Sequence, residues 1–142
     1  MDKVRIKKML ISGLVAGIVL SILSYGGLFI AVSIEFFTPF FVEYLSGVFI
    51  SDQSRDFFFY SHAMLISFAL SFFWDRSKSI FSGPFLLRGL EFGITYTIAG
   101  LLPILWMTYS QIDVSETMVL SWLGFGFFQS TIAGIIFARM NP

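Results

Sequence analysis

The chain has 142 residues, of which 56% are hydrophobic and 13% are charged, and its nine basic and nine acidic side chains leave no net charge. Soluble domains contain about 45–50% apolar residues with glycine included, and about 25% charged residues. A soluble fold of this length would expose much of its apolar surface to water, so the composition excludes an ordinary soluble domain and indicates a membrane protein.

Four uncharged stretches are long enough to cross a bilayer, which takes about 20 residues in a helix. They are 26 residues between Lys8 and Glu35, 18 between Asp56 and Asp75, 21 between Glu91 and Asp113, and 22 between Glu116 and Arg139. Helix is the expected form, because lipid offers no partner for unpaired backbone groups and the alternation of barrel strands is missing. The sequence therefore predicts an all-α membrane protein, an up-down four-helix transmembrane bundle forming a single integral membrane domain over 1–142. The predicted helices lie at about 9–33, 57–74, 88–108 and 117–138.

The first stretch follows the basic segment MDKVRIKK, which could begin a secretory signal peptide. The apolar part of such a signal runs for about 7–15 residues, and this one is far longer. We therefore expect an uncleaved signal anchor.

Residues 35–56 form the long connection between the first and second helices. Thr38-Pro39 is a typical helix start, since proline suits the first helical position. The segment at about 38–49 is too short to cross a bilayer and too apolar to lie in water, so we expect a short interfacial helix in this first outer loop. It would serve as a cap on the bundle or, alternatively, as a lid or partner-docking surface.

Lysine and arginine predict the orientation. Eight of the nine basic residues lie before the first helix, between the second and third, or after the fourth, and only Arg55 lies on the other side. The positive-inside rule therefore places both termini in the cytoplasm, in a multi-pass protein of the cell inner (plasma) membrane. Aromatic residues at the span ends agree, with Trp74 at the inner boundary and Tyr60, Trp106, Tyr109 and Trp122 at the outer one.

Small residues recur at every fourth position in the spans. The two clearest stripes are Gly13, Gly17 and Ser21 in the first helix and Gly126, Ser130 and Gly134 in the fourth. Residues four apart share one helix face, and small side chains allow the close approach that helix packing in lipid requires. Because the depths of the stripes match, we expect the first helix to pack on the fourth and the second on the third. The alternative is that the stripes make contacts between copies of the chain.

The residue types exclude several kinds of chemistry. The chain has no cysteine and one histidine, which excludes thiol catalysis, disulfides, thiolate metal sites, bis-histidine haem and multi-histidine zinc. It has no phosphate-binding loop, metalloprotease motif or paired-carboxylate spacing. No catalytic residue, cofactor or metal is expected. No nucleic-acid partner is expected either, because membrane orientation explains the basic N-terminus.

One group of polar residues in the outer half is the candidate ligand-binding site. His62 lies about 7 Å below the outer end of the second helix, and Tyr25 on the first helix has a similar depth. Ser24 and Ser61 should converge with them near a bend at Pro103 in the third helix. A pair of His62 with Tyr25 would be a structural tether, which we favour, or part of a quinone or proton site.

Two further polar pairs have a packing explanation. Tyr96 and Gln129 fall at matching depths in the third and fourth helices, so we expect a hydrogen bond between them. Glu91 follows Arg88 by three residues, which predicts an ion pair on one helix face, with a buried transport carboxylate as the alternative.

These features favour a non-catalytic subunit or accessory protein of a membrane complex. One alternative is a small oligomeric transporter or channel, and another is a membrane redox or quinone-binding anchor that uses the His62 region. The expected partners are the lipid bilayer and other membrane subunits, or further copies of this chain.

Overall fold

The computed structural model describes residues 3–38, 42–43 and 53–142, and within these ranges it contains helices and turns but no strand. Three of the four long helical segments are α1 (Lys3–Val32), α3 (Asp56–Ser77) and α6 (Glu116–Met140). The remaining one, the third in chain order, runs as α4 (Phe85–Tyr96), η4 (Thr97–Leu101) and α5 (Leu102–Gln111). Short 3₁₀ turns lie at Glu35–Phe37, Gln53–Arg55 and Lys78–Ile80. Four helical segments are long and apolar enough to cross a membrane, as the composition predicts.

The helices extend beyond the predicted spans. α1 begins at Lys3 rather than near residue 9, and α6 ends at Met140 rather than near 138. The physical reason is that charged residues end an apolar stretch without ending a helix, since lysine, arginine and glutamate are good helix formers. Of the predicted interfacial helix at about 38–49, positions 39–41 and 44–49 lie outside the described residues.

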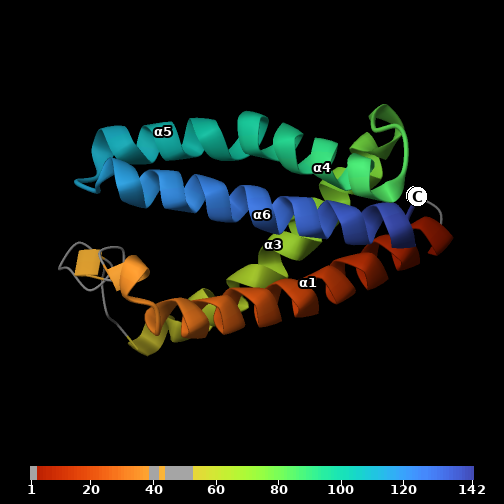
Figure 1. The fold of residues 1–142 in the computed structure, drawn as a ribbon. Coiled ribbons are helices and arrows are strands. Elements are labelled where there is room, and N and C mark those ends of the chain that lie inside the picture. The colour runs from red at the N-terminus through yellow and green to blue at the C-terminus, as the bar shows by residue number, and fades with distance from the viewer. Residues whose placement is uncertain (1–2, 39–41, 44–52) are drawn as a thin grey trace.

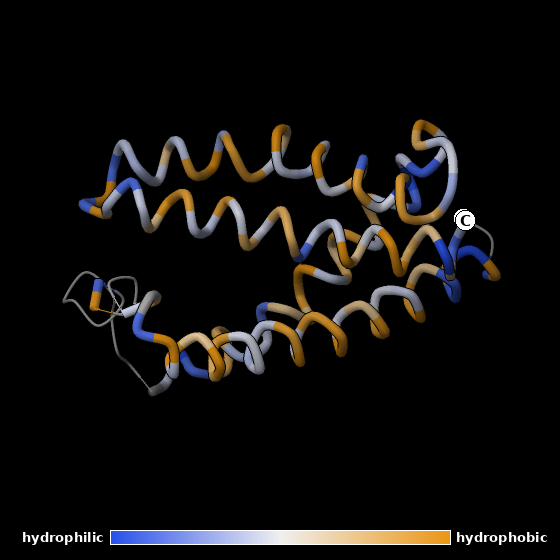
Figure 2. The backbone as a smooth tube through the Cα atoms, in the orientation of Figure 1, coloured by the Kyte–Doolittle hydropathy of each residue, from blue (hydrophilic) through white to orange (hydrophobic). Residues whose placement is uncertain are grey.

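Successive helices run in opposite directions, so the threading is up and down (Figure 1). The start of α1, the connection from α3 to α4 and the end of α6 lie together at one end of the molecule, which we call the basic end. Hydrophobic residues colour the helices on every side, and hydrophilic residues gather mainly towards the two ends (Figure 2). A helix that is apolar on all sides is typical of a lipid environment.

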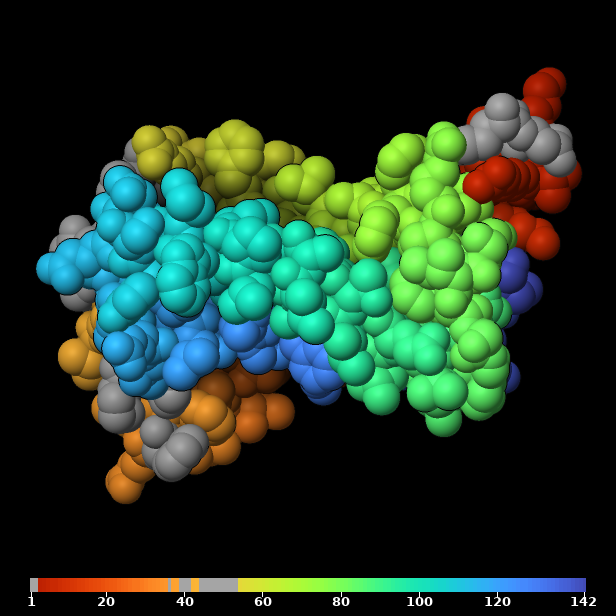
Figure 3. Space-filling model, turned by 90° about the horizontal axis from the view of Figure 1, so that it is seen from above, coloured from red at the N-terminus to blue at the C-terminus, as the bar shows by residue number. Residues whose placement is uncertain are grey.

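The principal helix pairs differ from the predicted ones. α1 packs mainly on α3, and α4 mainly on α6, while the contacts of α1 and α3 with α6 are less extensive. Seen from above, α4 and α5 lie over α6 (Figure 3). The prediction failed because an up-down threading makes the first helix antiparallel to both the second and the fourth. Matching depths therefore fit either neighbour equally well.

Glycines define both interfaces. A Cβ on Gly13 would meet Phe68 and Ser71, and one on Gly17 would meet Met64, so these glycines face α3. In the other pair, a Cβ on Gly89 would lie 2.5 Å from the backbone nitrogen of Ile135. The small residues thus allow α1 to approach α3 closely, and α4 to approach α6.

The fourth-helix stripe also turns to different neighbours than predicted. Gly134 lies against Phe92 and Gly89 of α4 rather than against Gly17, and Gly126 lies against Leu101. Ser130 is fully buried and donates to the Gly126 carbonyl, 2.8 Å away. Ser21 of the first stripe is half-buried and donates to the Gly17 carbonyl.

An aromatic cluster forms the core at the basic end. Trp74 stacks on Phe81 with ring centroids 5.6 Å apart, and meets Phe92 edge to face at 5.4 Å. Phe137 of α6 completes the cluster against Trp74 and Phe92. Each such pair contributes about 0.5–1.5 kcal/mol beyond its burial. Trp74 is therefore a fully buried core residue and not the boundary anchor that its position indicated.

In the opposite half of the molecule, α1 and α5 are packed more openly. The buried residues of α1 all lie between Ser12 and Leu20, and α5 has none. Pro103 lies at the start of α5, and the turn before it, Thr97–Leu101, is π-helical, with the Leu102 amide donating to the Thr97 carbonyl. Proline has no amide proton to continue the α-helical ladder, so the irregularity predicted at Pro103 takes the form of a wide π turn.

Candidate functional site

The four residues of the predicted outer site do not converge on one another. The Tyr25 hydroxyl donates to the backbone carbonyls of Tyr60 at 2.6 Å and of Phe59 at 3.1 Å, so it ties α1 to the start of α3 and is not hydrogen-bonded to His62. His62 is exposed on the side of α3 and has no hydrogen-bond partner among the described residues. The Ser61 hydroxyl points back to the Phe58 carbonyl, 3.4 Å away.

The remaining outer residue, Ser24, bonds across the bundle. It accepts a hydrogen bond of 3.0 Å from the side-chain amide of Gln129, which is 3% exposed. The pair predicted between Gln129 and Tyr96 is therefore replaced by one between α6 and α1. The prediction compared only the depths of Tyr96 and Gln129 and did not consider the direction in which each side chain leaves its helix.

The predicted ion pair between Arg88 and Glu91 is also absent. The Arg88 guanidinium lies over the Trp74 ring, 5.1 Å from its centroid, and donates to the Lys78 carbonyl at 3.4 Å. The Glu91 side chain is half-buried and has no ion-pair or hydrogen-bond partner among the described residues. A cation over a desolvated tryptophan face is worth up to about 2 kcal/mol, more than an exposed pair at this helical spacing, so Arg88 turns to the aromatic core.

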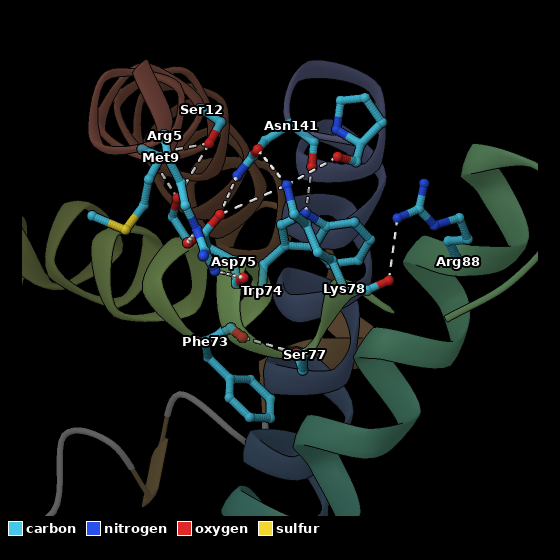
Figure 4. A network of polar contacts seen from close by, with 12 residues as sticks. Arg5, Met9, Ser12, Phe73, Trp74, Asp75, Ser77, Lys78, Arg88 and Asn141 are labelled. Atoms are coloured by element: carbon cyan, nitrogen blue, oxygen red, sulfur yellow. Dashed lines mark hydrogen bonds and ion pairs between the residues drawn. The ribbon is translucent and has the colours of Figure 1, made fainter. Parts of the chain in front are cut away.

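A polar cluster at the basic end centres on Asp75, which is 2% exposed (Figure 4). Arg5 Nε donates to Asp75 Oδ2 at 2.6 Å, and a second Arg5 nitrogen donates to the Asp75 backbone carbonyl at 2.8 Å. Asn141 donates to Asp75 Oδ1 at 3.3 Å, and the Lys78 ammonium lies 3.7 Å from the same oxygen. The buried carboxylate thus has cationic and amide partners from α1, from beyond α3 and from beyond α6.

Asn141 joins the C-terminal residues to the same cluster. Its backbone carbonyl accepts from the Trp74 indole at 2.9 Å, and its side-chain oxygen accepts from Lys78 at 2.8 Å. Nearby, Ser71 donates to the Met9 carbonyl at 2.6 Å. Desolvated charge-assisted bonds of this kind are strong when every group is satisfied, so the cluster fastens three chain segments together.

Asp75 and Asn141 are structural residues that sequence reasoning missed. One signal was available for Asp75, because it is an acid placed among basic residues directly after an uncharged stretch. Such an acid at the end of a span predicts a charge partner at the same end. Nothing comparable in the sequence distinguishes Asn141.

Two open cavities lie along the third helix. One, of about 240 Å³, lies between α5 and α6 and has almost wholly apolar walls that include Leu102, Trp106 and Leu123. The other, of about 350 Å³, lies beside the start of α4, where Glu91, Ser82 and Thr95 supply polar groups and Ile80, Phe81 and Ile94 supply apolar walls. The second cavity is the better candidate site, because it combines an unpaired carboxylate with hydroxyl groups.

No group of three or more histidine, cysteine, aspartate or glutamate residues that could hold a metal ion occurs in the part of the chain that the structure describes. Comparison with protein-family models, with curated proteins and with solved structures gives no match for this chain.

Proposed function

We propose that the chain is a four-span protein of the cell inner membrane that serves as a non-catalytic subunit or accessory protein of a membrane complex. Both termini and the connection from α3 to α4 lie on the cytoplasmic side in this proposal. Its support is the gathering of eight of nine basic residues at the basic end, together with four helices long and apolar enough to cross a bilayer.

The packing of α1 carries the proposal of a partner. Gly26 and Gly27 lie within this helix, and a Cβ on either would have no atom of the described residues within 4 Å. Glycine inside a helix costs roughly 0.5–1 kcal/mol relative to alanine, and no close contact from the described residues offsets that cost. A helix of another subunit packed against Gly26 and Gly27 would use the close approach that the two glycines allow.

The surroundings of these glycines favour a lateral contact within the membrane. Phe29 and Ile30 on the same helix are 79% and 61% exposed. Membrane helices associate through packing rather than through hydrophobic drive, so smooth glycine surfaces flanked by large apolar side chains favour a helix partner over lipid alone.

Purification from native membranes in mild detergent tests this proposal. We expect the wild-type chain to retain a foreign membrane subunit in a fixed ratio, and Gly26→Leu to lose it. Ile22→Leu is the matched control, because Ile22 is 66% exposed on the same helix and the substitution conserves the size of the side chain. A chain that purifies only as a homo-oligomer would favour the transporter or channel alternative, and equal retention by Gly26→Leu would contradict docking at this face.

Single cysteines test the orientation, because the chain has none of its own. Ser54 and Ser79 are both exposed and lie at opposite ends of the α3 region. In intact cells, an impermeant thiol reagent should label Ser54→Cys and spare Ser79→Cys. The reverse pattern would invert the proposed topology.

A further inference from the structure

We propose that the cavity beside the start of α4 binds the primary-ammonium headgroup of a phospholipid, with the Glu91 carboxylate as its counter-ion. The cavity is lined by Ile80, Phe81, Ser82, Glu91, Ile94 and Thr95. A ligand complementary to this lining has a positive charge, hydrogen-bond donors and an apolar part, and a lipid headgroup with its attached chains has all three.

Among the described acidic residues at the basic end, Glu91 is the one whose charge is not balanced by a basic side chain, so a cation from outside the chain can pair with it. Of the two described acidic residues there, Asp75 is neutralised by Arg5 and Lys78. Glu91 lies half-buried against the cavity with no cationic partner among the described residues, since Arg88 turns to Trp74. A carboxylate partly withdrawn from water is stabilised by a cation that also donates hydrogen bonds.

The Thr95 hydroxyl favours a ligand that donates hydrogen bonds. Thr95 lies one turn after Glu91 on the same helix face, and its hydroxyl proton is already given to the Glu91 backbone carbonyl at 2.8 Å. The Thr95 oxygen therefore offers only lone pairs to the cavity. Together with the Glu91 carboxylate it forms an acceptor site, which matches an ammonium group with three N–H donors and not a quaternary amine with none.

The position of the cavity favours a lipid over a water-soluble amine. Glu91 lies six residues beyond the first residue of α4, about 9 Å along the helix axis, and within one of the four candidate spans. The apolar walls include Ile80 and Ile94, which are 70% and 43% exposed on the outside of the molecule. This span of 27 residues is about 40 Å long and the hydrocarbon core is about 30 Å thick, so a centred span would place Glu91 near the boundary between headgroups and hydrocarbon. The basic residues at the same end would attract the lipid phosphate while Glu91 takes the ammonium.

Native mass spectrometry of the purified chain with added lipid tests the proposal. Phosphatidylethanolamine should give a one-to-one adduct, and phosphatidylcholine with the same acyl chains should give far less. Glu91→Gln should weaken the phosphatidylethanolamine adduct about tenfold, as expected when a charge-assisted hydrogen bond is lost. Thr95→Val should weaken it less, and Glu116→Gln, which removes an acid at the opposite end, should leave it unchanged.

Glu91 has no intramolecular partner among the described residues, so Glu91→Gln should keep the wild-type melting temperature. If that variant nevertheless fails to fold, the wild-type chain still decides the question through stepwise N-methylation of the headgroup, which should weaken the adduct at each step. Equal adducts with both lipids, or an undiminished adduct with folded Glu91→Gln, would overturn the proposal. Displacement of the lipid by millimolar ethanolamine would overturn the assignment to a lipid.

Discussion

Replacement of Gly89 by alanine tests the close packing of α4 on α6. The added Cβ would lie 2.5 Å from the Ile135 backbone nitrogen and 2.8 Å from its Cα. Both distances are shorter than any normal carbon contact, and backbone atoms cannot rotate away as a side chain can. The two helices would have to separate by several tenths of an ångström, and overpacking of this kind costs about 1–3 kcal/mol.

Gly26→Ala is the matched control, because its new Cβ would have no atom within 4 Å in the part of the chain that the structure describes. Both variants gain the same helix propensity, roughly 0.5–1 kcal/mol. The difference between their unfolding free energies therefore isolates the packing cost, and we expect Gly89→Ala to be less stable than Gly26→Ala by about 1–3 kcal/mol.

The assay is unfolding of the detergent-solubilised chain by titration with sodium dodecyl sulfate. Far-ultraviolet circular dichroism reports the helices, and tryptophan fluorescence reports in part on the core around Trp74, which is fully buried. Equal unfolding free energies for the two variants, within about 0.5 kcal/mol, would refute the close contact of α4 with α6 at Gly89.

Three further predictions concern the polar contacts. Asp75→Asn should lower the unfolding free energy by about 1–3 kcal/mol in the same titration, because Arg5 and Lys78 lose their anionic partner. The control Asp113→Asn, at an exposed position, should change the unfolding free energy little. Gln129→Leu should lower the unfolding free energy by about 0.6 kcal/mol, the average for interhelical hydrogen bonds in membranes, because the bond to Ser24 is lost. A loss above about 2 kcal/mol would contradict a role limited to this one hydrogen bond. The hydrogen bonds that Ser115 donates through its hydroxyl and its backbone amide hold the pKa of Glu43 below its ordinary value. This contact therefore adds stability above the ordinary carboxyl pKa and loses it as the pH falls through the folded-state value. In an infrared titration, Ser115→Ala should raise the Glu43 pKa toward that ordinary value, and an unchanged pKa would show that the contact is absent in solution.

The number of long apolar helices and the gathering of charge at one end could be read from the sequence alone. Both depend on the order of residue types along the chain, because a stretch of about 20 apolar residues has one stable form in lipid. The sequence also predicts Gly13, Gly17, Gly126 and Gly134 as packing residues, and the structure buries all four. What each of them packs against could not be read in the same way.

Only the tertiary structure decided which helices pair and where each polar side chain points. Depth along a helix is a one-dimensional quantity, whereas a hydrogen bond also requires that two side chains leave their helices in converging directions. Tyr25 and His62 share a depth, but Tyr25 turns to the carbonyls of Phe59 and Tyr60. Asp75 gains its partners from residues 70 and 66 positions away in the sequence, Arg5 and Asn141, and only folding brings these together.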